Sequence, residues 1–133
     1  MKSILVADDL LSWRKFHFDM LTRLYDSDVK IDMAESASSA YDKILEQIKT
    51  PYDIVITDLQ MESDFMPKYA GEWLVEQIKM LPQYYKTKIV IISSTNSIRL
   101  IADNYGVDYI PKSASMSVSQ YADVLLKTDT ENL

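Results

Sequence analysis

Three aspartates follow apolar stretches of the sequence and could act together chemically. Asp8 and Asp9 end the segment ILVADD, and Asp58 follows the run IVIT. Neighbouring carboxylates either raise one another's pKa or hold a cation, and a site built only from oxygen ligands favours Mg²⁺. The hydroxyl group of Ser93 and the ammonium group of Lys112 also follow apolar runs. Acids, metal, hydroxyl and ammonium together suit phosphoryl transfer, in which a carboxylate can be the nucleophile.

The composition of the chain limits the classes of protein to consider. A length of 133 residues suits one domain, which we expect at residues 1–127 with a polar tail at residues 128–133. Asp and Glu number 20 against 14 Lys and Arg, and the net charge of −6 disfavours direct binding to nucleic acid or a membrane surface. With no cysteine and one histidine, a metal must be held by oxygen. No apolar stretch is long enough for a signal peptide or a membrane span, so we expect a cytoplasmic protein.

Short apolar runs alternate with amphipathic segments, which predicts repeated β-α units. The first, third and fourth runs are continuously apolar, as in strands covered on both faces, whereas the second and fifth alternate or carry a charge, as at a sheet edge. A parallel sheet in the order 2-1-3-4-5 accommodates this pattern, with helices on both faces. We therefore predict an α/β fold, the flavodoxin-like (βα)5 three-layer sandwich. The expected strands are residues 3–7, 29–33, 54–57, 89–92 and 107–110.

Five amphipathic segments predict helices between and after these strands. We expect the first helix to be capped by Ser12, the second to run to Ile48, and the fourth to end at Gly106 in a left-handed conformation. His17 falls on or beside the buried face of the first helix, where we expect a packing role rather than a phosphoryl carrier. In such a sheet, ligands bind outside the carboxyl ends of the strands, between the first and the third. The aspartates that follow these two strands are therefore expected to converge.

With these residues at the ends of the expected strands, the chain resembles the receiver domain of two-component response regulators over essentially all of its length. The resemblance implies that Asp58 is the phosphoacceptor and takes phosphoryl from a histidine kinase or a phosphotransfer protein. It implies Mg²⁺ bound by Asp58, directly by Asp9, largely through water by Asp8, and by the backbone carbonyl of Gln60. Gln60 and Thr95 correspond to the positions that tune the lifetime of the phosphoryl group.

The resemblance also implies a switch. Ser93, Ser94 and Lys112 would bind the phosphoryl group, and Ser93 and Tyr109 would be the switch residues. Phosphorylation would shift a pre-existing equilibrium of the face formed by the fourth helix, fifth strand and fifth helix. That face would contact an output protein or domain, which the sequence does not identify, and it is the candidate homodimer interface.

The sequence departs from the receiver pattern at several points, two of which lie beside the expected site. The stretch after Asp58 is longer than usual, which indicates an insertion at residues 62–69. The receiver lysine is normally followed by proline through a cis peptide bond, whereas here Pro111 precedes Lys112 and Ser113 follows it. A cis bond between Lys112 and Ser113 would cost about 3 to 4 kcal/mol, so the loop must tolerate that cost or take another path.

Other functions are compatible with parts of the pattern. A receiver-like interaction module working without phosphorylation is favoured by the long loop and the missing Lys-Pro pair, but the complete acidic set opposes it. An aspartyl phosphatase would need an acid two residues after its nucleophile, where Gln60 follows Asp58 and Leu10 follows Asp8. Only two glycines are present, too few for a phosphate-binding loop. We expect no enzyme activity beyond Mg²⁺-dependent self-phosphorylation and autodephosphorylation.

Overall fold

The structure is a computed structural model, and it describes residues 1–61 and 69–127. Residues 62–68 of the expected insertion, with Glu62 and Asp64, lie outside the described residues. The polar tail at residues 128–133 lies outside them as well.

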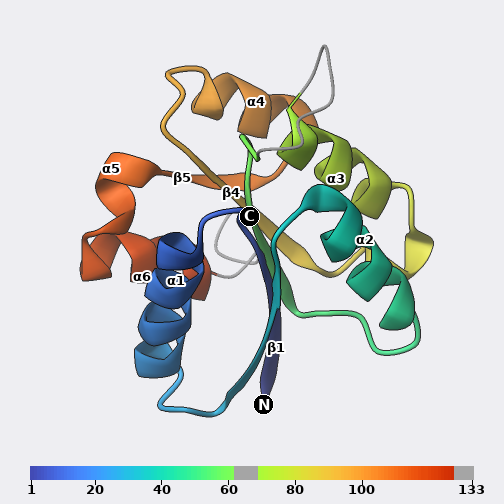
Figure 1. The fold of residues 1–133 in the computed structure, drawn as a ribbon, viewed down its shortest axis with the longest axis horizontal. Coiled ribbons are helices and arrows are strands. Elements are labelled where there is room, and N and C mark those ends of the chain that lie inside the picture. Colours follow the sequence, from blue (N-terminus) through green and yellow to red (C-terminus); the bar gives the residue numbers. More distant parts are fainter. Residues whose placement is uncertain (62–68, 128–133) are drawn as a thin grey trace.

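The centre of the fold is a five-stranded parallel sheet in the order β2-β1-β3-β4-β5, so the predicted sheet order is confirmed (Figure 1). The second and fifth strands, which were expected at the edges of the sheet from their sequence pattern, are its outermost strands. Each strand lies within one or two residues of its expected range. The strands are β1 (Lys2–Ala7), β2 (Val29–Ala34), β3 (Ile54–Asp58), β4 (Lys88–Ser93) and β5 (Asp108–Pro111).

The described residues form six α-helices and one short 3-10 helix, one α-helix more than expected. The additional helix, α5, has four residues and follows β5 directly. No described helix is long and apolar enough to cross a membrane. The helices are α1 (Leu11–Leu24), α2 (Ala37–Glu46), α3 (Ala70–Lys79), η1 (Pro82–Tyr84), α4 (Ile98–Tyr105), α5 (Lys112–Ser115) and α6 (Val118–Leu126).

Two predicted helix ends are wrong and one is confirmed. Ser12 is not a cap, because α1 starts one residue earlier and has Leu10 at its N-cap position. A carboxylate oxygen of Asp8 accepts the Leu10 N–H at 3.0 Å, so the turn before the helix is closed from upstream. Helix α2 ends at Glu46, two residues before the expected Ile48. Gly106 ends α4 with φ 67°, the left-handed conformation that glycine adopts without a steric cost.

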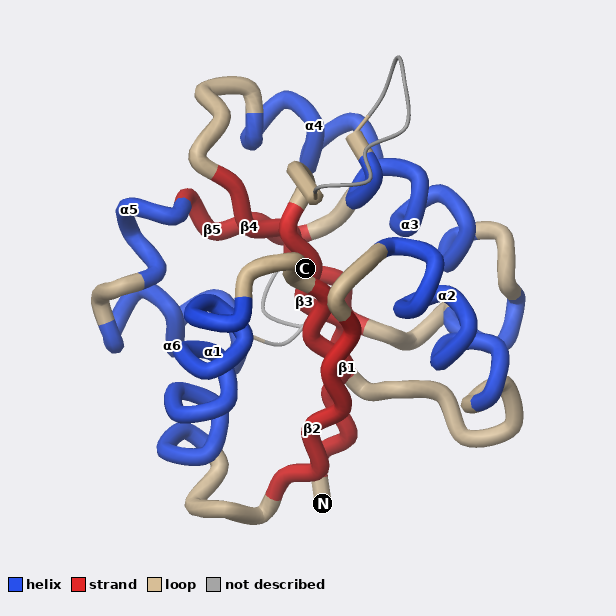
Figure 2. The backbone as a smooth tube through the Cα atoms, viewed as in Figure 1, coloured by secondary structure: helices blue, strands red, loops and turns tan. Residues whose placement is uncertain are grey.

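The sheet is covered on both faces, which makes three layers (Figures 1 and 2). Side chains alternate along β1, so Ile4 and Val6 pack with α1 and α6, whereas Leu5 and Ala7 pack with α2, α3 and α4. His17 is buried among the first set and its Nδ1 lies 2.9 Å from the Tyr121 hydroxyl oxygen, in agreement with the expected packing role.

The register of the central strands fixes where their ends meet. Asp58, the last residue of β3, pairs with Ile92 of β4, and Ser93 pairs with Pro111 of β5. Lys112 follows Pro111 as the first residue of α5. The carboxyl ends of the strands therefore gather the acids, the hydroxyl group and the lysine at one edge of the sheet.

Candidate functional site

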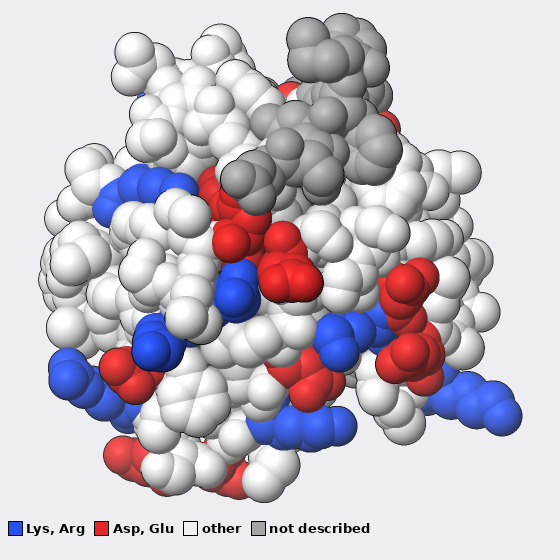
Figure 3. Space-filling view, in the orientation of Figure 1, with Lys and Arg blue, Asp and Glu red and all other residues white. Residues whose placement is uncertain are grey.

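The three aspartates lie together at the carboxyl edge of the sheet. One carboxylate oxygen from each of Asp8, Asp9 and Asp58 lies within 4.8 Å of the other two. Asp8 and Asp58 are only 1% and 3% exposed, and Asp9 is half-buried. Acidic side chains also gather near the centre of the face shown in Figure 3. The structure thus brings together all three acids that the sequence places after β1 and β3.

Backbone hydrogen bonds hold the two buried carboxylates. The Leu10 N–H donates to Asp8 at 3.0 Å, and the Gln60 N–H donates to the Oδ1 atom of Asp58 at 3.3 Å. The Arg14 guanidinium donates to the backbone carbonyl of Asp8 at 2.7 Å, a contact that the sequence did not indicate. The first two bonds restrain the carboxylates and leave oxygen lone pairs for a cation or a reacting group. The contribution of the Gln60 carbonyl as a metal ligand stays a prediction.

The buried acids repel one another. Burial, and then the charge of Asp8, raise the pKa of the Asp58 carboxyl to about 6, although the Lys112 ammonium and the Gln60 N–H act in the opposite direction. Burial also raises the pKa of Asp8, with a smaller contribution from the Asp9 charge. The ionised cluster is therefore under-compensated by the groups around it, and this favours binding of an added cation.

Lys112 reaches the site. Its Nζ atom lies 3.4 Å from the Oδ2 atom of Asp58, and its side chain is 19% exposed. The loop takes the path of a helix start, since Lys112 is the first residue of α5 and Pro111 before it has extended dihedral angles. The Ser115 hydroxyl donates to the Lys112 carbonyl at 2.7 Å and closes this short helix. The receiver Lys-Pro pair is therefore not needed to bring an ammonium group to Asp58.

The serines after β4 lie beside the lysine. Ser93 is fully buried and its hydroxyl accepts the Thr95 N–H at 3.1 Å, whereas Ser94 is exposed and Thr95 half-buried. A cavity of about 280 Å³ lies here, several times the roughly 30 Å³ that one water occupies in the liquid. The cavity is lined by Ser93, Ser94, Thr95, Asn96, Ile98, Pro111, Lys112 and Ser113.

Tyr109, the expected switch residue, lies in β5 and is half-buried. It pairs with Ile91 of β4 and packs against the core beneath α2, α3 and α4. Its position on the edge strand agrees with the sequence pattern. Its role as a switch, like the lifetime-tuning roles of Gln60 and Thr95, stays a prediction.

Two residues at the site were not identified from the sequence. Gly71, at the start of α3, lies so close to β3 that a Cβ atom there would collide with the carbonyl oxygen of Asp58 and the Cα atom of Leu59. Trp13 in α1 lies beneath the ammonium of Lys112, which is 5.0 Å from the centroid of the indole ring. The chain has only two glycines, and this rarity could have indicated that Gly71 has a specific structural role. The other tryptophan, Trp73, packs on Tyr41.

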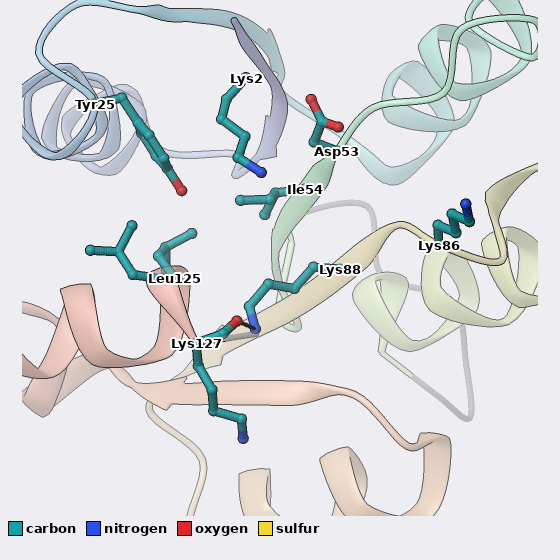
Figure 4. A pocket seen from close by; sticks show the side chains of 9 residues that line it. Lys2, Tyr25, Asp53, Ile54, Lys86, Lys88, Leu125 and Lys127 are labelled. Carbon is teal, nitrogen blue, oxygen red and sulfur yellow. Dashed lines mark hydrogen bonds between the residues drawn. The ribbon is translucent and has the colours of Figure 1, made fainter. Parts of the chain in front are cut away.

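A second charged region lies at the opposite edge of the sheet, around a pocket of about 260 Å³ (Figure 4). Two of its lysines, Lys88 and Lys127, have an acidic partner. The Nζ atom of Lys88 lies 3.1 Å from Asp108 and donates to the Lys127 carbonyl at 3.2 Å, and the Nζ atom of Lys127 lies 3.5 Å from Asp108. The pocket is lined by Lys2, Tyr25, Asp53, Ile54, Lys86, Lys88, Leu125, Leu126 and Lys127.

Comparison with known proteins finds structural similarity. No protein-family model and no curated protein sequence matches the chain. A response regulator receiver domain from Clostridium thermocellum matches with a TM-score of 0.76 and 18% identity, over 95% of this chain and 92% of that one. The chemotaxis response regulator CheY4 of Vibrio cholerae matches with a TM-score of 0.69 and 19% identity, over 92% of this chain and 98% of its own.

A third match is the response regulator Rcp1, whose structure is described as its Mn²⁺-bound form. It matches with a TM-score of 0.68 and 17% identity, over 96% of each chain. Several of the similar structures are described as receiver domains, and these match 95% to 96% of this chain. The chain therefore has the flavodoxin-like fold of response regulator receiver domains, and the predicted fold is confirmed.

Proposed function

We propose that the chain is a phosphoacceptor receiver domain of a two-component response regulator, switched by Mg²⁺-dependent phosphorylation of Asp58. One observation carries the proposal: a buried carboxylate at the end of β3 lies within reach of two further carboxylates and of the Lys112 ammonium. Acids alone would be compatible with a turn or a helix cap. An ammonium group 3.4 Å from one of them, beside a buried hydroxyl group and a cavity, suits an incoming phosphoryl group.

In the proposed reaction, a carboxylate oxygen of Asp58 attacks the phosphorus atom of the donor and forms a P–O bond. The bond from phosphorus to the leaving imidazole nitrogen or acyl oxygen breaks, and its electron pair leaves with that atom. With acetyl phosphate as donor, acetate leaves as the anion and needs no proton. Lys112 neutralises charge on the transferred group, and Ser93 can donate its hydroxyl hydrogen to one of its oxygens.

The donor set fits a hard divalent cation, because it consists of carboxylate oxygens whose charges exceed the positive charge around them. We propose that Asp8, Asp9 and Asp58 hold Mg²⁺ together with the backbone carbonyl of Gln60. The cation would neutralise charge on the phosphoryl oxygens when bound. The Mn²⁺-bound form of Rcp1, which shares this fold, supports a divalent cation here.

The proposed output is a change in a protein-binding face. Transfer to Asp58 adds charge and acceptor oxygens, which draw Lys112 and Ser93 toward the phosphoryl group and let Tyr109 repack inward. The face of α4, β5 and the following helices would then bind an output protein or domain, or a second copy of the chain. The donor would be a histidine kinase or a phosphotransfer protein in the cytoplasm. The domain would catalyse only its own phosphorylation and dephosphorylation.

Intact-mass measurement tests this proposal. The chain incubated with acetyl phosphate and Mg²⁺ is expected to gain the mass of one phosphoryl group, and to gain none when EDTA removes the cation. Asp58→Asn should abolish the gain. Asp53→Asn, a substitution at the opposite edge of the sheet, should leave it unchanged. A gain that persists in Asp58→Asn contradicts the assignment, and a folded wild-type chain that never gains the mass would instead be an interaction module.

A further inference from the structure

The ammonium group of Lys112 makes two contacts within the described residues. On one side it lies 3.4 Å from the Oδ2 atom of Asp58. On the other it lies 5.0 Å from the centroid of the Trp13 ring, within the range of a cation–π interaction. The indole ring is the aromatic group that binds cations most strongly. Lys112 is therefore held between a reacting carboxylate and an aromatic face.

The Trp13 ring is itself held in place by an aromatic cluster, which we define as Trp13, Phe16, His17 and Tyr121. The ring of Phe16 meets Trp13 edge-on, with centroids 5.4 Å apart and an interplanar angle of 79°. The ring of His17 lies 5.9 Å from Trp13, and its Nδ1 atom lies 2.9 Å from the Tyr121 hydroxyl oxygen in α6. Trp13 thus connects the site to rings from two helices.

The backbone alone does not fix the position of the Lys112 ammonium group, because a flexible four-carbon stem separates the two. The residue opens α5, which has only four residues, and a lysine side chain has many rotamers. We propose that Trp13 is a positioning residue, whose ring holds the Lys112 ammonium at the distance from Asp58 that phosphoryl transfer requires. This inference rests on the proposed function and deepens it. It assigns the aromatic cluster a role that core packing alone does not include.

The charge state of the cluster agrees with this role. Burial, and then the charge of Lys112, lower the pKa of His17 to about 4, so its ring is neutral near pH 7. A charged imidazolium in the cluster would repel the ammonium that Trp13 holds. Arg14, the next residue along α1, donates to the Asp8 carbonyl, and its guanidinium is therefore directed toward β1. Lys112 is the cation for which a contact with Trp13 is found among the described residues.

Phosphorylation kinetics test the proposal. Trp13→Leu should slow transfer from acetyl phosphate by about 3-fold to 10-fold, because it removes the ring face but keeps an apolar side chain. Trp13→Phe should fall between the two, since phenyl rings bind cations less strongly. Trp73→Leu, which removes the other tryptophan, half-buried in α3, should leave the rate within about 2-fold of wild type.

A double-mutant cycle separates positioning from a general loss of packing. In a Lys112→Met chain, Trp13→Leu should cause no further slowing, because no ammonium remains to be positioned. Equal slowing by Trp13→Leu with and without Lys112 would overturn the proposal. Equal rates for wild type, Trp13→Phe and Trp13→Leu would overturn it as well.

A second measurement does not depend on phosphorylation, so it distinguishes failure of this inference from failure of the proposed function. The ring current of Trp13 should move the NMR signals of the Lys112 side chain upfield of those of other lysines. Trp13→Leu should abolish the shift and Trp73→Leu should preserve it. A Lys112 signal at the position of an exposed lysine in the wild-type chain would overturn the contact. A shifted signal in a chain that is never phosphorylated would overturn the proposed function, and with it the role in transfer, but not the contact itself.

Discussion

The two ends of the parallel strands carry charge in different ways. We call the side where the strands begin the amino edge and the side where they end the carboxyl edge. At the amino edge, Lys88 and Lys127 share Asp108, and a carboxylate oxygen of Asp53 accepts the Ser3 N–H at 2.8 Å. At the carboxyl edge, the three aspartates face one ammonium, and burial and mutual repulsion raise the pKa of Asp58 to about 6. These four charged groups of the amino edge therefore have partners within the fold. The repulsion among the buried carboxylates of the carboxyl edge instead lowers the stability of the fold while no cation is bound.

This difference indicates which edge is functional. A charged group whose only role is to stabilise the fold should be paired or exposed to solvent, because burying it without a partner costs free energy. Buried carboxylates with too few partners are therefore expected where a protein binds a cation or performs chemistry. The amino-edge pocket has more lysines than acids. Its ion pairs of Lys88 and Lys127 with Asp108 nevertheless indicate a structural role for this region.

The largest effect is expected from a substitution that removes the repulsion between the carboxylates at the carboxyl edge. Asp58→Asn should raise the free energy of unfolding near pH 7 in metal-free buffer by about 3 kcal/mol, which corresponds to the rise in pKa from 3.8 to about 6. Asp53→Ala at the amino edge should have the opposite sign and lower it by about 1 kcal/mol, because the Ser3 N–H loses its acceptor. Urea denaturation measures both, and destabilisation by Asp58→Asn would contradict the comparison.

The next effect concerns the cation. Mg²⁺ at about 100 times its dissociation constant should raise the free energy of unfolding of the wild-type chain by about 2.7 kcal/mol, because it binds only the folded acids. Asp8→Asn and Asp58→Asn should each reduce this gain, whereas Lys88→Met at the amino edge should preserve it. NaCl at matched ionic strength controls for screening. Equal stabilisation of all four chains by Mg²⁺ would show that no specific site exists.

The stability gap between the Asp58→Asn and wild-type chains should depend on pH. Because folding raises the pKa of Asp58, the stability that its proton confers is fully present below about pH 3.8 and is lost as the pH rises through about 6. The gap should therefore fall to roughly half between about pH 7 and about pH 5. His17, whose pKa is lowered, acts with the opposite sign but equally in both chains. A gap that widens on acidification would contradict the raised pKa.

The smallest effect is expected at the amino edge. Lys88→Met should lower the free energy of unfolding by about 1 kcal/mol, because Asp108 is partly exposed and keeps Lys127 as a partner. It should leave the rate of phosphorylation unchanged, whereas Lys112→Met at the carboxyl edge should slow it. The two chains are compared by urea denaturation and by transfer from acetyl phosphate. Slowing by Lys88→Met would show that the amino edge also takes part in the function.

Much of the fold could be predicted from sequence because the buried strands differ from the edge strands in their apolar pattern. The start of α1 could not, since its turn is closed by the Asp8 carboxylate and not by a hydroxyl residue inside the helix. Helix α5 was missed because four residues are too few to show helical periodicity.

The site likewise has residues that strand order predicts and residues that it does not. Asp58, Ser93 and Lys112 follow strands directly, so the sheet order alone brings them to one edge. The contacts of Trp13 with Lys112 and of Gly71 with Asp58 depend on how helices pack across the sheet ends. The spacing of side chains along one helix shows which residues share a face but not which residues of other elements they contact.

We propose that the incompletely compensated charge of the carboxylates at the carboxyl edge serves phosphorylation of one residue. Fragmentation mass spectrometry of the chain after treatment with acetyl phosphate and Mg²⁺ locates the phosphoryl group directly. A single phosphoryl group on Asp58 is expected. A group on Asp8, Asp9 or His17, with Asp58 unmodified, would contradict it.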